Sequence, residues 1–317
     1  MDVEFYEIYP KEEWKFKSSI YINLRIEMIA EDIVLGVDIG GSHITAALIN
    51  IKSGQIVEGS LSRTKVDSQG SVAGILKQWC KVMADSLQFA ENDGHIAIAM
   101  PGPFDYSGGI SQMQGMGKFD SLYGLNVREL ILTGLGRLAR TVVFVNDASC
   151  FLQGELSHGK ASIYPNVLGI TLGTGFGSAI GVAGVAHDAA FWQYGFMGTT
   201  CEELFSSKWL VSRYNNIAGD RVENVKELID NATHSGSLLQ LFDEFAYNMG
   251  IFLAKIHREL GLDCVVIGGN IAKAWTLFLP QLQYYLKVRS VDLTVLISSK
   301  GEHAALIGAA CMPHAKT

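Results

Sequence analysis

The sequence predicts an α/β protein that contains one strand–turn–strand unit twice. Residues 35–49 (LGVDIGGSHITAALI) reappear in altered form as residues 168–182 (LGITLGTGFGSAIGV), with Gly40 matching Gly173. Each copy is an apolar, β-branched run, a glycine-containing turn and a second apolar run, which is the pattern of two paired strands. With 317 residues, the chain also exceeds the usual size of one hydrophobic core and fits two domains.

In the first half, we expect an antiparallel three-stranded meander that is extended by alternating helices and strands. Gly40-Gly41 and Ser53-Gly54 supply the turns of the meander. Apolar residues at helical spacing predict the first helix. The expected strands are 33–39, 44–51, 55–61, 95–100 and 141–145, and the expected helices are 72–87 and about 127–138. This order is the ribonuclease H-like layout.

The second half repeats this layout from residue 166 onward. Its longest helix is expected over 238–260, where Gly261 ends it, and a short buried strand over 264–267 runs into a helix from 271. No low-complexity linker separates the halves, so a continuous hinge is expected near residues 148–160, between two domains around a central cleft. The expected parts are an extension over 1–31, domains over 32–147 and 148–302, and a C-terminal helix about 303–317 that can pack back on the first domain.

Composition and charge argue against several classes of protein. The formal net charge is −7, which provides no basic surface for nucleic acid. The five cysteines are widely spaced, which favours buried free thiols in a reducing compartment. No apolar run is long enough to span a bilayer, and the acidic N-terminus differs from a secretion signal. We therefore expect a cytoplasmic protein that binds neither nucleic acid nor a membrane.

The two glycine turns predict a site for a polyphosphate. Glycine permits positive φ and lets backbone N–H groups approach an anion, since no Cβ intervenes. Asp38 ends the first strand, where its carboxylate can hold the Mg²⁺ of ATP, directly or through water. The predicted phosphate-binding residues are Gly40, Gly41, Ser42, Gly173, Thr174 and Gly175. The pattern indicates an ATP-dependent transferase, and the alternative is two unrelated hairpins in a glycine-rich chain.

Two other phosphate-binding motifs are missing from the sequence. No Gly-x-x-x-x-Gly-Lys-Ser/Thr loop occurs, which excludes a P-loop enzyme. The glycines of residues 173–177 have the wrong spacing for a dinucleotide fingerprint. Neither a Walker-type ATP site nor an NAD site is therefore expected.

Asn146-Asp147 follows the strand expected over 141–145. An Asp at the carboxyl end of a sheet strand points into the ligand crevice of such folds. There it can accept the proton of a substrate hydroxyl that attacks the γ-phosphate. Asp147 is therefore the candidate general base. The alternative is that Asn146 and Asp147 only cap the helix that begins near Ala148.

Several short motifs occur together in one order. They are Asp38-Ile39-Gly40-Gly41-Ser42, Pro101-Gly102-Pro103 with Asp105, Asn146-Asp147 with Glu155, Leu172-Gly173-Thr174-Gly175, Ile267-Gly268-Gly269 and Leu306-Ile307-Gly308-Ala309-Ala310. Over residues 33–312 the chain resembles the ROK family of repressors and sugar kinases, glucokinases included, within the actin and hexokinase superfamily. The resemblance implies ATP-dependent phosphorylation of a hexose or amino sugar, glucose-like above all, with Mg²⁺, and a homodimer.

The resemblance also implies roles for single residues. Asp147 would be the base, Asn146 a ligand of a sugar hydroxyl and Asp38 the carboxylate on the Mg²⁺ side. The adenosine side of the nucleotide would lie at Gly268, Gly269 and Asn270.

The chain departs from the family where many members bind zinc. Those members carry Glu-x-Gly-His, a cysteine cluster and then a sugar-binding Glu, whereas this chain has Gln193-Tyr194-Gly195-Phe196 and retains only Cys201. A structural zinc needs four ligands, so no zinc site is expected. Glu203 aligns with the sugar-binding Glu, with Glu202 as the alternative. Gln193 can still bond a sugar hydroxyl.

Two further features bear on the sugar. His187 is a candidate replacement for the missing His, although a lone His in a turn is more often structural. The loop over 108–118 is a candidate for sugar specificity or a flexible edge.

Two other functions stay open at this stage. The chain could be a non-catalytic sugar sensor or regulator of the same family, although the segment before residue 32 is too short for the DNA-binding domain of a repressor. It could also be another actin-like ATPase. Asn146-Asp147, Glu203 and Pro101-Gly102 favour a small hydroxyl acceptor, and hence the kinase.

Overall fold

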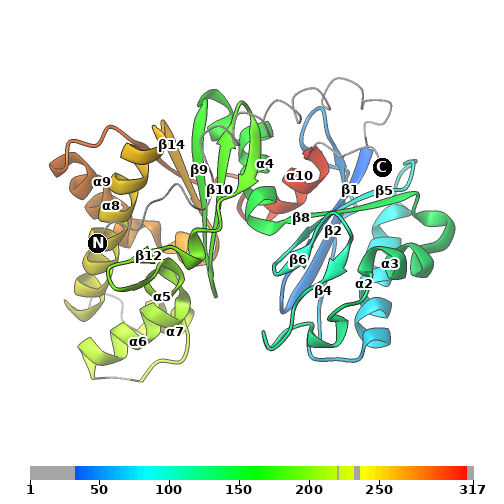
Figure 1. Cartoon of the computed structure of the whole chain (residues 1–317), viewed down its shortest axis with the longest axis horizontal. Coiled ribbons are helices and arrows are strands. Elements are labelled where there is room, and N and C mark those ends of the chain that lie inside the picture. Colours follow the sequence, from blue (N-terminus) through cyan, green and yellow to red (C-terminus); the bar gives the residue numbers. More distant parts are fainter. Residues whose placement is uncertain (1–32, 220, 232–235, 313–317) are drawn as a thin grey trace. The chain divides into compact units, whose positions relative to one another are not determined.

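The computed structural model describes residues 33–219, 221–231 and 236–312 (Figure 1). Within this part the chain forms two compact units. Residues 33–146, 182–185 and 306–312 make the first unit, and residues 147–181 and 186–305 make the second. The expected extension over 1–31 and the last residues of the expected C-terminal helix lie outside the described residues.

The first unit is built on a mixed sheet. Its strands are β1 (Ile33–Ile39), β2 (His43–Asn50), β3 (Gln55–Ile56), β4 (Ser62–Lys65), β5 (His95–Met100) and β8 (Thr141–Asn146). The order is β3-β2-β1-β5-β8, with β4 also paired to β2. Pairing is antiparallel between β1 and β2 but parallel from β1 to β5 and from β5 to β8. The carboxyl ends of β1, β5 and β8 therefore meet at one edge of the sheet.

The third strand, expected over 55–61, differs from the prediction. It consists of two short strands, β3 and β4, which both pair with β2. The chain bends between them at Gly59, whose φ is +80°. The Ser60 side chain forms hydrogen bonds at this break in the strand. Its hydroxyl accepts from the Leu48 N–H (3.1 Å) of β2 and donates to the Val57 carbonyl (2.7 Å).

Helices cover the first sheet. α2 (Val72–Leu87) and α3 (Val127–Leu135) pack side by side on it (Figure 1). α3 is shorter than expected because Gly136, with a φ of +54°, ends it before a 3₁₀ turn. The Leu306 carbonyl of α10 (Ala304–Cys311) would lie 2.3 Å from a Cβ at Gly36 of β1. Glycine at this position therefore lets the C-terminal helix approach the strand.

The second unit repeats the sheet of the first. Its strands are β9 (Asn166–Leu172), β10 (Phe176–Val182), β11 (Val185–Asp188), β14 (Cys264–Gly268) and β15 (Thr294–Ile297). Their order, β11-β10-β9-β14-β15, is again third, second, first, fourth, fifth. β14 runs parallel to β9 and β15, as β5 does to β1 and β8. The predicted α/β fold with a duplicated ribonuclease H-like unit is therefore confirmed.

The helices of the second unit include α4 (Asp147–His158), which packs on β9, and the pair α8 (Gly236–Leu260) and α9 (Trp275–Val288). The helix expected from residue 271 begins as a 3₁₀ turn that continues into α9. Several short elements between β11 and α8 were not predicted. They are β12 (Gly195–Phe196), β13 (Thr199–Thr200), α5 (Cys201–Phe205), α6 (Ser207–Ala218) and α7 (Val225–Asn231). Within the described ranges, every helix is too short or too polar to cross a membrane.

Candidate active site

The first glycine turn, Gly40-Gly41-Ser42, joins β1 to β2. The Gly40 N–H donates to the His43 carbonyl (2.9 Å), and the Ser42 carbonyl accepts from the Val66 N–H (2.9 Å). Asp38 lies two residues before the turn and is partly exposed. Carboxylate oxygen is the ligand type that Mg²⁺ prefers, so Asp38 fits the predicted metal side of a nucleotide.

The glycines of the two turns do not use the positive φ that glycine permits. Gly40, Gly41, Gly173 and Gly175 all lie outside the left-handed region. An added Cβ would be 3.6 Å from its nearest neighbour at Gly40 and at Gly41, and would meet nothing within 4 Å at Gly173. Neither strain nor packing requires these three glycines. What the missing Cβ provides is open space, which a bound anion can use.

The second turn, Gly173-Thr174-Gly175, joins β9 to β10 and is held by neighbouring helices. The Gly173 carbonyl accepts from the N–H (2.8 Å) and the hydroxyl (2.7 Å) of Ser207, the first residue of α6. The Glu202 carboxylate accepts from the Phe176 N–H (3.3 Å) and would lie 2.6 Å from a Cβ at Gly175. An acidic side chain therefore fills part of the space beside this turn.

The third glycine segment, Gly268-Gly269-Asn270, ends β14. A Cβ at Gly268 would lie 2.3 Å from the Phe151 ring, and one at Gly269 would lie 2.3 Å from the Leu172 carbonyl. Gly269 also has a φ of +86°. Packing and conformation therefore explain both glycines, and Asn270 follows them as an exposed residue. Contact with adenosine stays a prediction here.

Asn146 and Asp147 lie at the junction of β8 and α4, and both are partly exposed. The Asn146 amide donates to the Tyr106 hydroxyl (3.3 Å), which in turn donates to the Met100 carbonyl (3.1 Å). The Asp147 carboxylate accepts from the N–H of the next residue, Ala148 (2.9 Å). The side chain of a helix N-cap usually accepts from the N–H of the second or third residue after it, not the first. This bond alone therefore does not make Asp147 a standard N-cap.

A second carboxylate belongs to the surroundings of Asp147. The pKa of Asp188 is raised, first by partial desolvation of a carboxyl that still reaches the surface and then by the negative charge of Asp147, while the bond from the Ala190 N–H (2.9 Å) opposes the shift. His187, the candidate replacement for the missing His, precedes Asp188 in β11 and is partly buried. The second unit therefore places one further carboxylate, that of Asp188, close enough to interact with the candidate base.

Tyr106 is a site residue that sequence reasoning missed. It follows β6 (Phe104–Asp105), which pairs with β7 (Ile110–Ser111). The Arg128 guanidinium holds this hairpin, because it donates to the carbonyls of Tyr106 (3.1 Å), Ser107 (2.9 Å) and Val142 (3.0 Å). The only signal in the sequence was the neighbouring Pro101-Gly102-Pro103 motif. Arg128 therefore positions the hydroxyl that orients Asn146.

The expected sugar ligands lie on exposed segments of the second unit. Gln193 is exposed at the end of a 3₁₀ turn. Glu203 forms a capping box with Thr200, whose N–H and hydroxyl both donate to it (3.1 Å each), and it also accepts from the Thr199 hydroxyl. These bonds, that of Thr199 first, lower the pKa of Glu203. Glu203 is thus ionised and engaged locally, while the alternative, Glu202, faces the second turn.

Aromatic rings pack around the segment in which the family resemblance led us to look for a zinc cluster. Phe196, in the position of the expected His, is buried, and its ring centroid lies 5.8 Å from that of Phe252 and 6.1 Å from that of Phe205. Cys201 is fully buried, and burial raises the pKa of its thiol to about 12, so the thiol stays protonated. No group of three or more His, Cys, Asp or Glu side chains among the described residues is placed to hold a metal. These residues do not fit a zinc ion.

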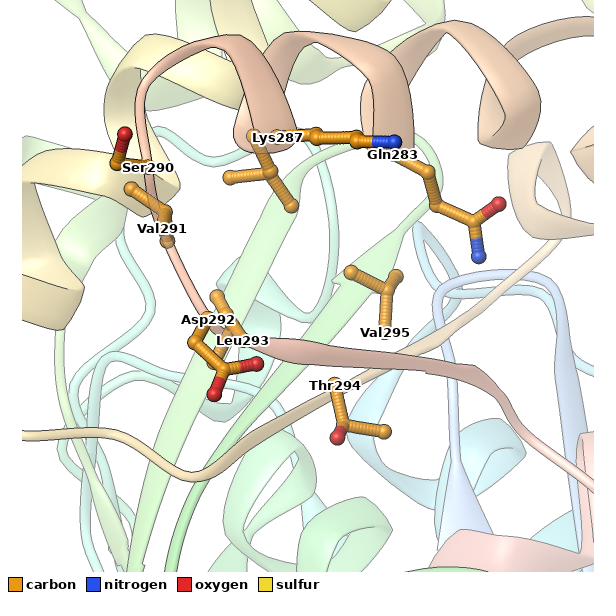
Figure 2. A pocket seen from close by; sticks show the side chains of 9 residues that line it. Gln283, Lys287, Ser290, Val291, Asp292, Leu293, Thr294 and Val295 are labelled. Carbon is orange, nitrogen blue, oxygen red and sulfur yellow. The ribbon is translucent and has the colours of Figure 1, made fainter.

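A surface hollow lies elsewhere in the second unit, between the end of α9 and β15 (Figure 2). Lys287, Asp292 and Thr294 are among its lining residues. None of the candidate site residues lines it, so it plays no part in the site.

Comparisons with known proteins agree with the motifs. The sequence pattern of the ROK family matches residues 34–316. The N-acetyl-D-glucosamine kinase of Mannheimia succiniciproducens is 28% identical over 312 residues, covering 87% of this chain and 98% of the relative. The N-acetylgalactosamine kinase AgaK of Shewanella sp. is 25% identical, covering 88% and 96%.

The fold is also found among solved structures. A ROK family glucokinase from Streptomyces griseus, in complex with glucose and AMPPNP, has a TM-score of 0.69 at 22% identity. The likeness covers 88% of this chain and 98% of that one. The resemblance predicted from the motifs is confirmed, and the chain belongs to the ROK family.

Proposed function

We propose that this chain is an ATP-dependent kinase that transfers the γ-phosphate of ATP to a hydroxyl of a hexose or amino sugar. One observation carries the proposal. Gly40, Gly41 and Gly173 have neither a left-handed φ nor a close neighbour, so the fold does not need glycine at these positions. Close approach of a polyphosphate to the backbone gives both turns a reason to lack a Cβ.

The roles of the residues follow from their chemistry. The first turn and Asp38 would hold the phosphates and Mg²⁺, the latter directly or through water. Asn146 would bond a sugar hydroxyl, and Asp147 would accept the proton of the attacking one. The N–H groups of the second turn would also contact the phosphates. Glu203 and Gln193 would complete the sugar site, and Gly268, Gly269 and Asn270 the adenosine site.

The reaction is a single displacement at phosphorus. The hydroxyl oxygen forms a new bond to the γ-phosphorus, and the bond to the bridging oxygen breaks with its electron pair on ADP. The proton of the hydroxyl moves to Asp147. Magnesium, when bound, neutralises charge on the phosphates. Closure of two domains, as in other such kinases, would exclude water from the transfer.

The sugar is a hexose or an amino sugar in this proposal, and N-acetylhexosamines come first. Two relatives that align over most of the chain are named for N-acetyl-D-glucosamine and N-acetylgalactosamine. Glucose comes next, since a glucokinase shares the fold.

The proposal extends to the setting of the enzyme. A homodimer follows from the family resemblance, and no nucleic-acid partner is proposed. All five cysteines are free thiols, which suits the reducing cytoplasm.

The test is sugar-dependent release of ADP from Mg²⁺-ATP. The panel contains N-acetylglucosamine, N-acetylgalactosamine, N-acetylmannosamine, glucose, mannose and fructose. We expect one class of sugar to stimulate turnover, and Asp147→Asn to lower kcat by about 10²- to 10⁴-fold.

The matched control for this test is Asp85→Asn. Asp85 is an exposed carboxylate on α2 that pairs with Lys81. This variant should keep full activity. Sugar binding without ADP release from any sugar would instead favour the non-catalytic sensor, and full activity in Asp147→Asn would remove the proposed base.

A further inference from the structure

Lys118 lies against the first glycine turn. Its Cδ would be 3.6 Å from a Cβ at Gly41, so the aliphatic part of the side chain rests on the face of the turn where the Cβ is missing. The ammonium group is two bonds beyond that carbon. Lys118 forms no ion pair or hydrogen bond with any other residue that the structure describes. Its charge is therefore available to a ligand.

The backbone on both sides of Lys118 is fixed. The Gly117 carbonyl accepts from the Gln69 side chain (3.4 Å), and the Phe119 N–H donates to the Ser68 carbonyl (2.6 Å). The ring of Phe119 is fully buried and meets Trp79 edge-on, with centroids 5.2 Å apart. The loop therefore presents this lysine from an anchored backbone, which reduces the entropy that a contact with ligand would cost.

The segment that anchors the loop also holds the turn. Val66, just before Ser68 and Gln69, donates to the Ser42 carbonyl (2.9 Å). The turn, residues 66–69 and residues 117–119 are thus tied together by hydrogen bonds within one unit. Their relative positions do not depend on any movement of the second unit.

Charges of both signs lie near the turn, and Asp38 is one of the negative ones. Lys65, in β4, stands directly opposite His43 in the register of β2 and β4 and is exposed. The carboxylates of Asp67 and Asp120 accept from the N–H groups of Gln69 and Met116 (3.1 Å each), so both are engaged in their own loops. Two lysines beside one turn stand out in a chain whose net charge is −7.

We propose that Lys118 is a catalytic residue whose ammonium group contacts the terminal phosphate of ATP bound at the first turn. This inference rests on the proposed function. The chain has no P-loop lysine, and Lys118 would supply the same kind of charge from a distant loop. A positive charge there stabilises the negative charge on the phosphoryl group during transfer. It would also distinguish ATP from ADP, which lacks that group.

The test compares two nucleotides in the full chain. The dissociation constants of Mg²⁺-AMPPNP and Mg²⁺-ADP are measured by titration calorimetry for the unmutated protein, Lys118→Met and Lys118→Arg. We expect Lys118→Met to weaken AMPPNP binding about 10-fold or more, as for loss of a charge-assisted bond, and to change ADP binding less than about 3-fold. Lys118→Arg should keep most of the preference for AMPPNP.

The control is Lys77→Met, which changes an exposed lysine on α2, and circular dichroism checks the fold of every variant. The inference would be overturned if Lys118→Met weakened the binding of AMPPNP and ADP equally, or if it bound both nucleotides as Lys77→Met does.

The kinase assay distinguishes this inference from the proposed function. An active kinase in which Lys118→Met behaves as the control removes only this inference. Nucleotide discrimination through Lys118 without sugar phosphorylation removes only the proposed function, and failure to bind either nucleotide removes both.

Discussion

The two glycine turns have the same place in two sheets of the same order, yet their surroundings differ in charge. The first follows Asp38 and has Lys118 against Gly41. The second follows Thr171, and the carboxylate of Glu202 lies beside Gly175. A Cβ at Gly41 would be in ordinary contact with Lys118, whereas one at Gly173 would meet nothing within 4 Å, so the flanking side chains decide which group can use each turn. Duplication has therefore supplied one scaffold and two chemically different sites.

The difference suggests a division of labour. A turn that follows a carboxylate and has a lysine against it suits the phosphate that is transferred, if that carboxylate holds Mg²⁺ as proposed. A turn whose neighbour is acidic, and whose carbonyl is held by Ser207, suits a weaker contact through N–H groups alone. The predictions below test this division in order of decreasing effect.

The largest effect should come from the strand position that differs between the two copies. Asp38→Asn removes the metal-side charge, and we expect kcat to fall about 10²- to 10³-fold. Thr171→Val, the matched change in the second copy, should lower it less than about 5-fold, since a hydroxyl binds Mg²⁺ poorly. Steady-state kinetics at varied Mg²⁺ measure both. Equal losses would mean that the two turns share the metal.

Alanine substitutions at the turn glycines distinguish an effect on ligand binding from an effect on folding. Gly41→Ala and Gly173→Ala should leave the melting temperature unchanged, because neither position is strained or crowded. Each should raise the KM for ATP by about 10-fold, since the new methyl group fills the space of a phosphate. Gly269→Ala is the contrasting control, and strain and overlap with the Leu172 carbonyl should lower its stability by about 2–4 kcal/mol. Unfolding of Gly41→Ala would show that the turn glycine is structural.

A smaller effect is expected at Glu202. Glu202→Gln keeps an oxygen for the Phe176 N–H but removes a negative charge beside the second turn. We therefore expect ATP to bind about 2- to 5-fold more tightly, as for one partly exposed charge. Titration with AMPPNP measures it. Weaker binding would give Glu202 a direct role with the nucleotide or its metal.

The smallest effect concerns pH. The pKa of Asp188 is raised, first by burial, so its charged form is disfavoured in the folded protein. Its contribution to stability is therefore fully present below the ordinary carboxyl pKa and is lost as the pH rises through the folded value. Asp188→Asn should abolish this loss of stability. The melting temperature of the variant should then depend less on pH between the ordinary carboxyl pKa and the raised pKa of Asp188. An unchanged pH profile in the variant would contradict the raised pKa of Asp188.

The fold could be predicted because its signals are local. Apolar runs, Gly40, Gly173 and Gly261 mark strands, turns and a helix end along the sequence. The break at Gly59 was missed because it depends on Ser60 reaching Leu48 across the sheet. The sequence could not tell which property of the turn glycines matters: they do not adopt positive φ, and it is the missing Cβ that distinguishes them.

The site was predictable only where residues are adjacent in sequence. Asn146-Asp147 and the turns could be read from motifs. Tyr106 is far from Asn146 in the chain, as Lys118 is from Gly41, and only the folded loops bring each pair together. The packing of Phe196 against Phe252 likewise depends on the fold.

The most direct test of the central claim is identification of the product. ³¹P NMR of the chain with Mg²⁺-ATP and the sugar that stimulates ADP release would follow ATP, ADP and any phosphate ester together. The account predicts a sugar monophosphate in equal amount to ADP, and almost none with Asp147→Asn. Formation of inorganic phosphate without a sugar ester, or equal ester from the variant, would contradict it.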